Sequence, residues 1–141
     1  MNDRKSRKIT IASARSTPAV VRGEDSDSIH RAREASRRFA ADLTPAPDPS
    51  TAESLVLVVT ELVTNALRHG GGRYTLELTA TPDSVTAAVS DPSAAPPTER
   101  APDLSGGGGF GWHMVRRLAT ELTVTRGPST GKTVRARLAF G

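Results

Sequence analysis

Residues 54–72 read SLVLVVTELVTNALRHGGG, and this stretch decides the fold. Apolar residues cover nearly the whole circumference of its first turns, which is typical of a buried helix. Glu61, Asn65 and His69 follow one another at intervals of four residues, so their side chains share one face of that helix. A buried carboxylate or amide needs a partner, because an unpaired buried polar group costs roughly 1–3 kcal/mol. That partner can be protein or ligand, and the helix alone leaves both readings open.

The composition indicates a single globular domain. The chain has 141 residues, of which 36% are hydrophobic and 24% are charged. It contains no cysteine, which excludes disulfides and thiolate metal sites. The net charge of +4 favours a solvated basic tail and a basic helix face over nucleic-acid binding, because aromatic residues make up only 4%. With no apolar run of the ~20 residues that span a membrane and no apolar signal core, we expect a cytoplasmic protein and no membrane partner.

The hydrophobic pattern predicts an α+β domain over residues 17–141, preceded by a disordered basic tail over residues 1–16. Helical spacing predicts helices over 28–43, 50–69 and 110–120, and Ser50 with Glu53 suggests a capping box for the second. Alternation predicts strands over 17–22, 73–80, 85–90, 122–126 and 132–140. Short connections between strands favour a two-layer α/β sandwich, with a mixed, mostly antiparallel sheet and helices on one face. The segment 92–109 is long and rich in Pro and Gly, which makes it a candidate lid.

Four features along the chain suggest a nucleotide pocket. The Asn65 amide oxygen is a suitable hard ligand for Mg²⁺, and the Glu61 carboxylate one turn away can take a proton from an attacking hydroxyl. Asp91 ends a strand, where its carboxylate can accept a hydrogen bond from an exocyclic amine such as that of adenine. The alternative for each is structural: a hydrogen-bonded pair on the helix, and a turn-initiating Asp before Pro92.

The other two features are a glycine run and a hydroxyl. The run, residues 106–111 (GGGGFG), leads directly into a helix. Backbone N–H groups and the positive end of the helix dipole there favour the binding of phosphate. A flexible linker has the same composition, but the apolar helix that follows favours the phosphate interpretation. Thr133, close after Gly131, offers a hydroxyl that could complete a phosphate site.

In this order, the four features resemble the Bergerat ATP-binding fold of the gyrase, chaperone, histidine-kinase and mismatch-repair (GHKL) ATPases. The resemblance covers roughly residues 17–140 and is greatest to the anti-sigma-factor serine/threonine kinases of bacteria, including the stand-alone actinobacterial type. VVTELVTNALRHG resembles their N box, VSDPS the first Gly box, GFGWHMV the second, and GKT the final Gly-x-Thr. The N box is specific, whereas the other motifs count mainly through order and spacing.

The resemblance implies a role for each matching residue. Glu61 would be the catalytic base, Asn65 the Mg²⁺ ligand, and Asp91 the residue that reads adenine. Ser93 stands where the first Gly box usually has glycine, and Arg100 is the only basic residue of the short candidate lid. The remaining positions implied to hold ATP are Gly106, Gly107, Gly108, Gly109, Phe110, Gly111 and Thr133.

The function implied is that of an ATP-binding anti-sigma factor with serine/threonine kinase activity. In such a family the protein holds a sigma factor, often as a homodimer, and phosphorylates an anti-anti-sigma antagonist of the STAS type. One alternative is a non-catalytic ATP-binding switch, in which nucleotide orders the segment 92–109 to control a partner. Another is a basic nucleic-acid-binding module, whose affinity would fall steeply with salt. ATP binding is implied by the first two hypotheses, whereas a base at Glu61 is needed only by the first.

Overall fold

The computed structural model describes residues 17–93, 110–127 and 131–140, with only the backbone of Phe110. The expected tail over 1–16 and most of the candidate lid lie outside these residues. The described helices and strands are, in chain order, β1 (Ala19–Gly23), α2 (Asp27–Asp42), α3 (Pro49–His69), β2 (Tyr74–Thr81), β3 (Ser84–Asp91), α4 (Phe110–Leu118), β4 (Glu121–Arg126) and β5 (Lys132–Ala139).

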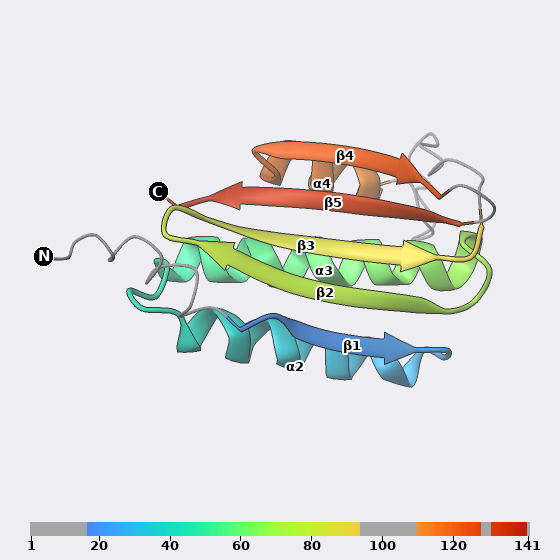
Figure 1. Cartoon of the computed structure of the whole chain (residues 1–141), viewed down its shortest axis with the longest axis horizontal. Coiled ribbons are helices and arrows are strands. Elements are labelled where there is room, and N and C mark those ends of the chain that lie inside the picture. Colours follow the sequence, from blue (N-terminus) through green and yellow to red (C-terminus); the bar gives the residue numbers. More distant parts are fainter. Residues whose placement is uncertain (1–16, 94–109, 128–130, 141) are drawn as a thin grey trace, which may run out of the picture.

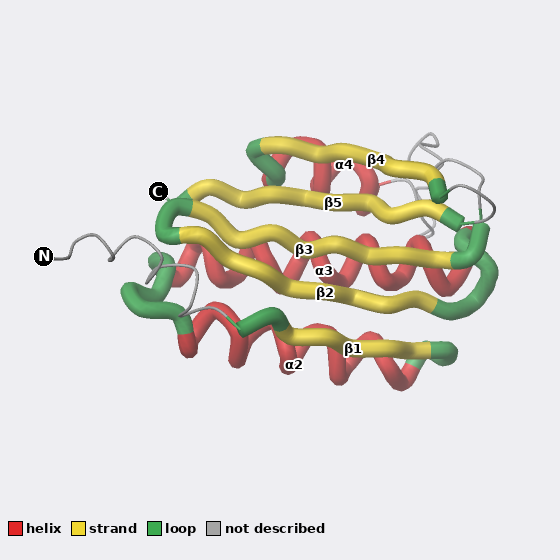
Figure 2. The backbone as a smooth tube through the Cα atoms, in the orientation of Figure 1, coloured by secondary structure: helices red, strands yellow, loops and turns green. Residues whose placement is uncertain are grey.

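The strands form one five-stranded sheet in the order β1-β2-β3-β5-β4, and all four pairings are antiparallel. The three helices lie together behind the sheet, with α3 behind β2 and β3, α2 beside β1, and α4 behind β4 and β5 (Figure 1). Figure 2 shows the resulting two layers, with strands in front and helices behind. The predicted α+β sandwich with helices on one face is therefore confirmed, and the sheet is antiparallel at every described pairing.

Helix α3 forms the centre of the core. Its buried residues are Leu55, Val56, Val58, Val59, Leu62, Val63 and Ala66. They pack against the inward side chains of the central strands, such as Leu76, Val89 and Ala136, which are at most 2% exposed. Burying such side chains contributes about 1.5–3 kcal/mol each, so the apolar character of α3 fixes its position against the sheet.

The start of α3 differs from the prediction. The helix begins at Pro49, and Asp48 is its N-cap, whose carboxylate accepts a hydrogen bond from the Thr51 amide at 3.3 Å. Proline suits the first turn of a helix, because its missing N–H would have no intrahelical partner there. The helix therefore begins one residue before Ser50, and the capping box predicted for Ser50 and Glu53 is not its cap.

Candidate functional site

The polar stripe of α3 lies at the border between the core and solvent. Glu61 and Asn65 are half-buried, while His69 in the last turn is exposed. The Asn65 amide makes no side-chain hydrogen bond with any residue that the structure describes. A half-buried amide without a protein partner is the kind of group that a ligand would satisfy.

Asp91 lies at the end of β3, on the sheet face that the helices cover. Lys132, opposite Asp91 in the pairing of β3 with β5, forms an ion pair with it. The Lys132 Nζ lies 3.0 Å from Asp91 Oδ1 and 3.0 Å from Oδ2. The two side chains are only 3% and 4% exposed, respectively. Asp91 therefore has a protein partner, Lys132, in addition to any ligand.

Ser93 and Gly70 complete the surroundings of the Asp91 carboxylate. The backbone N–H of Ser93 donates to Oδ1 at 2.9 Å, and the Ser93 carbonyl accepts from Lys132 Nζ at 3.4 Å. These contacts use backbone groups, so a serine makes them as well as a glycine would. Gly70, which follows α3, approaches so closely that a Cβ there would lie 2.4 Å from Asp91 Oδ2. The absence of a side chain at Gly70 thus lets the end of α3 lie directly against the carboxylate.

Glu61 faces the start of α4. A Cβ built on Gly111 would overlap the Glu61 carboxylate oxygen Oε1, so this position of α4 requires glycine for the carboxylate to lie where it does. Burial raises the pKa of Glu61, and the positive charge of Arg68 partly opposes that rise. A carboxylate with a raised pKa is better suited to accept a proton near neutral pH.

A cavity of about 440 Å³ opens beside this carboxylate. It is lined by Glu61, Gly111, His113, Met114, Arg117 and Leu118. The lining therefore comes mainly from α4, and the cavity gives the Glu61 carboxylate an approach from outside the core.

The surroundings of Asp91 and those of Glu61 lie at different points along α3. From Glu61 to Gly70 is nine residues, which corresponds to about 13 Å at the rise of an α-helix. Asn65 lies between them on the same stripe. The order along the helix is therefore the Asp91 carboxylate at the Gly70 end, the Asn65 amide in the middle, and the Glu61 carboxylate beside α4.

Thr133 does not join these residues. It lies on the sheet face opposite the helices, where its hydroxyl hydrogen-bonds that of Ser90 at 2.7 Å. On β5 the buried positions alternate as Lys132, Val134, Ala136 and Leu138, so Lys132 and not Thr133 points toward α3. This period of two was visible in the sequence and could have identified Lys132 as the inward residue.

Several predicted positions lie outside the described residues. Arg100, Gly106, Gly107, Gly108 and Gly109 belong to the segment 94–109, and the side chain of Phe110 is also outside. Helix α4 does begin at Phe110, as the glycine-run interpretation requires. The contribution of Arg100 and of the residues 106–110 to phosphate binding stays a prediction.

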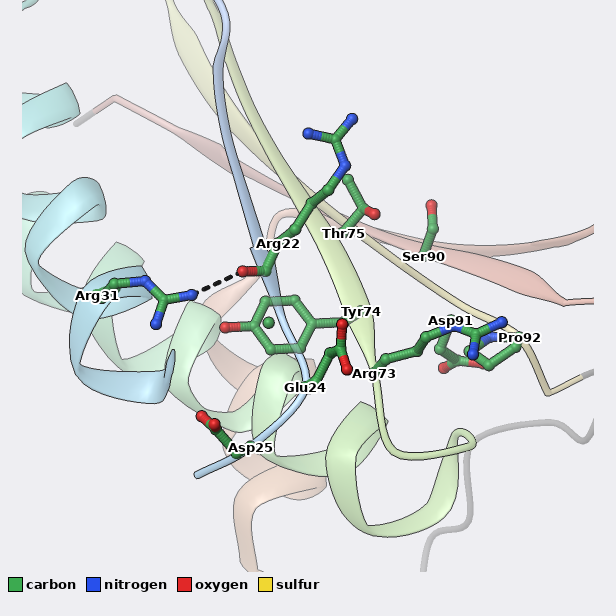
Figure 3. Close-up of a pocket in the computed structure, with 11 residues that line it drawn as sticks. Arg22, Glu24, Asp25, Arg31, Arg73, Tyr74, Thr75, Ser90, Asp91 and Pro92 are labelled. Atoms are coloured by element: carbon green, nitrogen blue, oxygen red, sulfur yellow. Dashed lines mark hydrogen bonds between the residues drawn. The ribbon is translucent and has the colours of Figure 1, made fainter. Parts of the chain in front are cut away.

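A larger cavity of about 580 Å³ lies at the end of β3, and its lining includes Ser90, Asp91 and Pro92. Figure 3 shows Arg31 donating to the Arg22 carbonyl, and Arg73 extending toward the Asp91–Pro92 end of β3. This cavity contains none of Glu61, Asn65 or Gly111. Asp91 does line this cavity, so the Asp91 end of the candidate site is approached from here, whereas Glu61 is approached from the 440 Å³ cavity beside α4.

The described residues contain no group of three or more His, Cys, Asp or Glu side chains that could hold a metal ion by themselves. A metal at Asn65 would thus depend on ligand oxygens, which is how Mg²⁺ is often held beside substrate phosphates. The Asn65 amide, half-buried and without a described protein partner, fits that arrangement.

Replacing Gly111 by alanine is expected to displace the Glu61 carboxylate while leaving the fold intact. The new Cβ would occupy the space of Oε1, and the flexible Glu61 side chain would move away. If Glu61 acts on a bound hydroxyl, a displacement of about 1 Å can lower the rate about 100-fold. Phosphoryl transfer, nucleotide affinity and thermal unfolding should be measured together, and an unchanged transfer rate would contradict the placement of Glu61 beside α4.

Comparison with known proteins identifies the family of the chain. Residues 24–138 match the family described as "Histidine kinase-like ATPase domain". A search of curated proteins finds no match. No described helix is long and apolar enough to cross a membrane.

Two solved structures match this chain, and the first of them has a similar fold. The RsbU and RsbW domains of Rv1364c from Mycobacterium tuberculosis superpose with a TM-score of 0.65 at 19% identity, over 88% of this chain. This chain spans only 32% of that one. The histidine kinase domain of the E. coli osmosensor EnvZ gives a TM-score of 0.43 at 24% identity, over 64% of this chain and 66% of that one. The family match covers most of the chain and agrees with the resemblance found in its N box. The chain therefore belongs to the histidine kinase-like ATPase domain family, and this membership implies that it binds ATP.

Proposed function

We propose that this chain is an Mg²⁺-ATP-dependent serine/threonine kinase that acts as an anti-sigma factor in the cytoplasm. The observation that carries the proposal is the order of groups along α3: a buried acceptor at Asp91, an amide at Asn65 that no described residue hydrogen-bonds, and a carboxylate of raised pKa at Glu61. A nucleotide lying along this helix would place its base at one end and its terminal phosphate at the other. A domain of the same fold occurs in the structure of the RsbU and RsbW domains of Rv1364c.

Asp91, the start of α4 and Asn65 would bind different parts of ATP. Asp91 accepts a hydrogen bond from the exocyclic amine of adenine, which orients the base. The start of α4 directs backbone N–H groups toward the phosphates, where the helix dipole favours negative charge. Mg²⁺ held by the Asn65 amide oxygen would neutralise phosphate charge when bound.

Glu61 would act on the acceptor hydroxyl. Its carboxylate accepts the hydroxyl proton as the acceptor oxygen forms a bond to the γ-phosphorus. The bond between the γ-phosphorus and the β–γ bridging oxygen breaks, and ADP leaves. The 440 Å³ cavity beside Glu61 gives a serine or threonine of a partner an approach to this carboxylate. We propose that the acceptor belongs to an anti-anti-sigma protein of the STAS type, and that a homodimer holds the sigma factor.

Transfer of radiolabelled phosphate from ATP to a co-purified STAS-type partner tests the proposal. We expect label on a serine or threonine of the partner, dependent on Mg²⁺. ATP binding without any transfer, with nucleotide still controlling the partner's binding, would instead identify a non-catalytic ATP-dependent switch.

A further inference from the structure

The ion pair between Lys132 and Asp91 is buried, unlike the ion pairs of Arg37 with Glu34 and of Arg137 with Glu121. In the pair of Arg37 with Glu34 the side chains are 44% and 49% exposed, and in that of Arg137 with Glu121 they are 40% and 60% exposed. Lys132 and Asp91 are 3% and 4% exposed. Exposed pairs contribute little, whereas a buried pair requires a specific arrangement of donors and acceptors. The hydrogen bonds around the Asp91 carboxylate therefore show what this buried pair can do.

The hydrogen-bonding capacity of the carboxylate can be counted. A carboxylate has about four acceptor positions, two on each oxygen. Oδ1 receives both Lys132 Nζ and the Ser93 N–H, so its two positions are occupied. Oδ2 receives Lys132 Nζ, and the described residues supply no second donor to it. Among the described residues, one acceptor position on Oδ2, the oxygen that lies against Gly70, therefore receives no donor.

Lys132 makes this remaining position a fixed acceptor. Its ammonium bridges both carboxylate oxygens and also approaches the Ser93 carbonyl at 3.4 Å, so the three groups hold one another in place. Without the ammonium, Asp91 would be a buried charge with no counter-charge, and Ser93 N–H would be its sole described donor. A buried carboxylate without a counter-charge is strongly disfavoured, so the Asp91 side chain would rotate or move toward solvent.

We propose that Lys132 is a specificity-determining residue that positions Asp91, so that the pocket selects a purine with an amino group at C6 over one with a carbonyl there. This inference rests on the proposed function, because it assumes that Asp91 reads the base. The single acceptor position on Oδ2 can receive one N–H of an exocyclic amine. A carbonyl oxygen at C6 would instead face a fixed, negatively charged acceptor, which repels it.

The test compares ATP with inosine triphosphate (ITP), which differs at C6, by calorimetry in the presence of Mg²⁺. The wild-type protein should prefer ATP by about 10- to 100-fold, as expected for a hydrogen bond to a charged group. Lys132→Met should bring the two dissociation constants within about threefold of each other, because the acceptor is no longer fixed. Arg135→Met is the matched control, since it removes an exposed cation from the same strand and should keep the wild-type preference.

The ratio remains informative if Lys132→Met is partly unfolded. Both nucleotides are measured on the same preparation, so a loss of folded protein weakens both affinities equally and cancels in the ratio. A wild-type protein without preference, or a Lys132→Met variant that keeps the preference, would overturn the proposal. So would tighter ATP binding by that variant with its preference intact, because Lys132 would then be blocking the base.

Asp91→Asn distinguishes failure of this inference from failure of the proposed function. If Asp91→Asn binds ATP and ITP as the wild type does, Asp91 does not read the base, and both proposals lose that assignment. If Asp91→Asn loses the preference but Lys132→Met keeps it, Asp91 reads the base without help from Lys132, and only this inference fails.

Discussion

Replacing Glu61 by glutamine is expected to lower the rate of phosphoryl transfer by about 100- to 10,000-fold, which is the usual contribution of a general base. Glutamine has nearly the same shape but cannot accept the hydroxyl proton. The affinity for ATP should stay close to that of the wild type, because Asp91 and Asn65 are unchanged. Single-turnover transfer to the partner, with ATP affinity measured in parallel, separates the two effects.

The pH dependence gives this prediction a second readout. Burial raises the pKa of Glu61, and only the ionised carboxylate can take a proton. Transfer by the wild type should therefore rise with pH through a pKa above that of an ordinary glutamate, and the variant should lack this rise. Glu53→Gln, at an exposed position of the same helix, is the control and should transfer at the wild-type rate. A Glu61→Gln variant that transfers normally would remove Glu61 from the chemistry.

Replacing Asp91 by alanine is expected to lower the free energy of unfolding by about 3–5 kcal/mol, the cost of breaking a buried ion pair by removing one partner. The Lys132 side chain, which is 3% exposed, would lose its counter-charge. Urea denaturation without nucleotide measures this effect directly. Asp42→Ala, at an exposed position at the end of α2, should change stability by no more than about 0.5 kcal/mol.

The double variant Asp91→Asn with Lys132→Met tests the cause of that loss. If an uncompensated buried charge is responsible, removal of both charges should recover much of the stability lost in Asp91→Ala. Equal losses in the double variant and in Asp91→Ala would mean that the shape of the carboxylate, and not its pairing with Lys132, holds the end of β3.

The fold was predictable because its layers follow from simple periodicities. The almost wholly apolar turns of α3 predict burial, and alternation along Tyr74–Thr81 and Lys132–Ala139 predicts strands with one buried face. The start of α3 was harder to predict, because Ser50 with Glu53 matches a capping box, whereas the N-cap is Asp48, two residues earlier and followed by Pro49. Competing caps two residues apart differ little in sequence signal.

The candidate site was predictable only where sequence spacing determines geometry. Glu61 and Asn65 share a stripe because a helix imposes it, and Asp91 ends its strand on the helix-covered face. Thr133 was assigned by motif order, which does not specify a sheet face, whereas the alternation of β5 places Lys132 inward. The pairing of Lys132 with Asp91 joins residues 41 positions apart, and only the antiparallel register of β3 with β5 brings them together.

The central claim, that α3 carries an Mg²⁺-ATP site, is tested most directly by titration calorimetry of the wild type and Asn65→Ala. Thr64→Ala, at the adjacent and also half-buried position of α3, is the matched control. We predict that the wild type and Thr64→Ala bind Mg²⁺-ATP with similar affinity, and that Asn65→Ala shows at least about a tenfold loss, as removal of a hydrogen bond to a charged group would cause. Equal binding by wild type and Asn65→Ala, or no binding by either, would contradict the account.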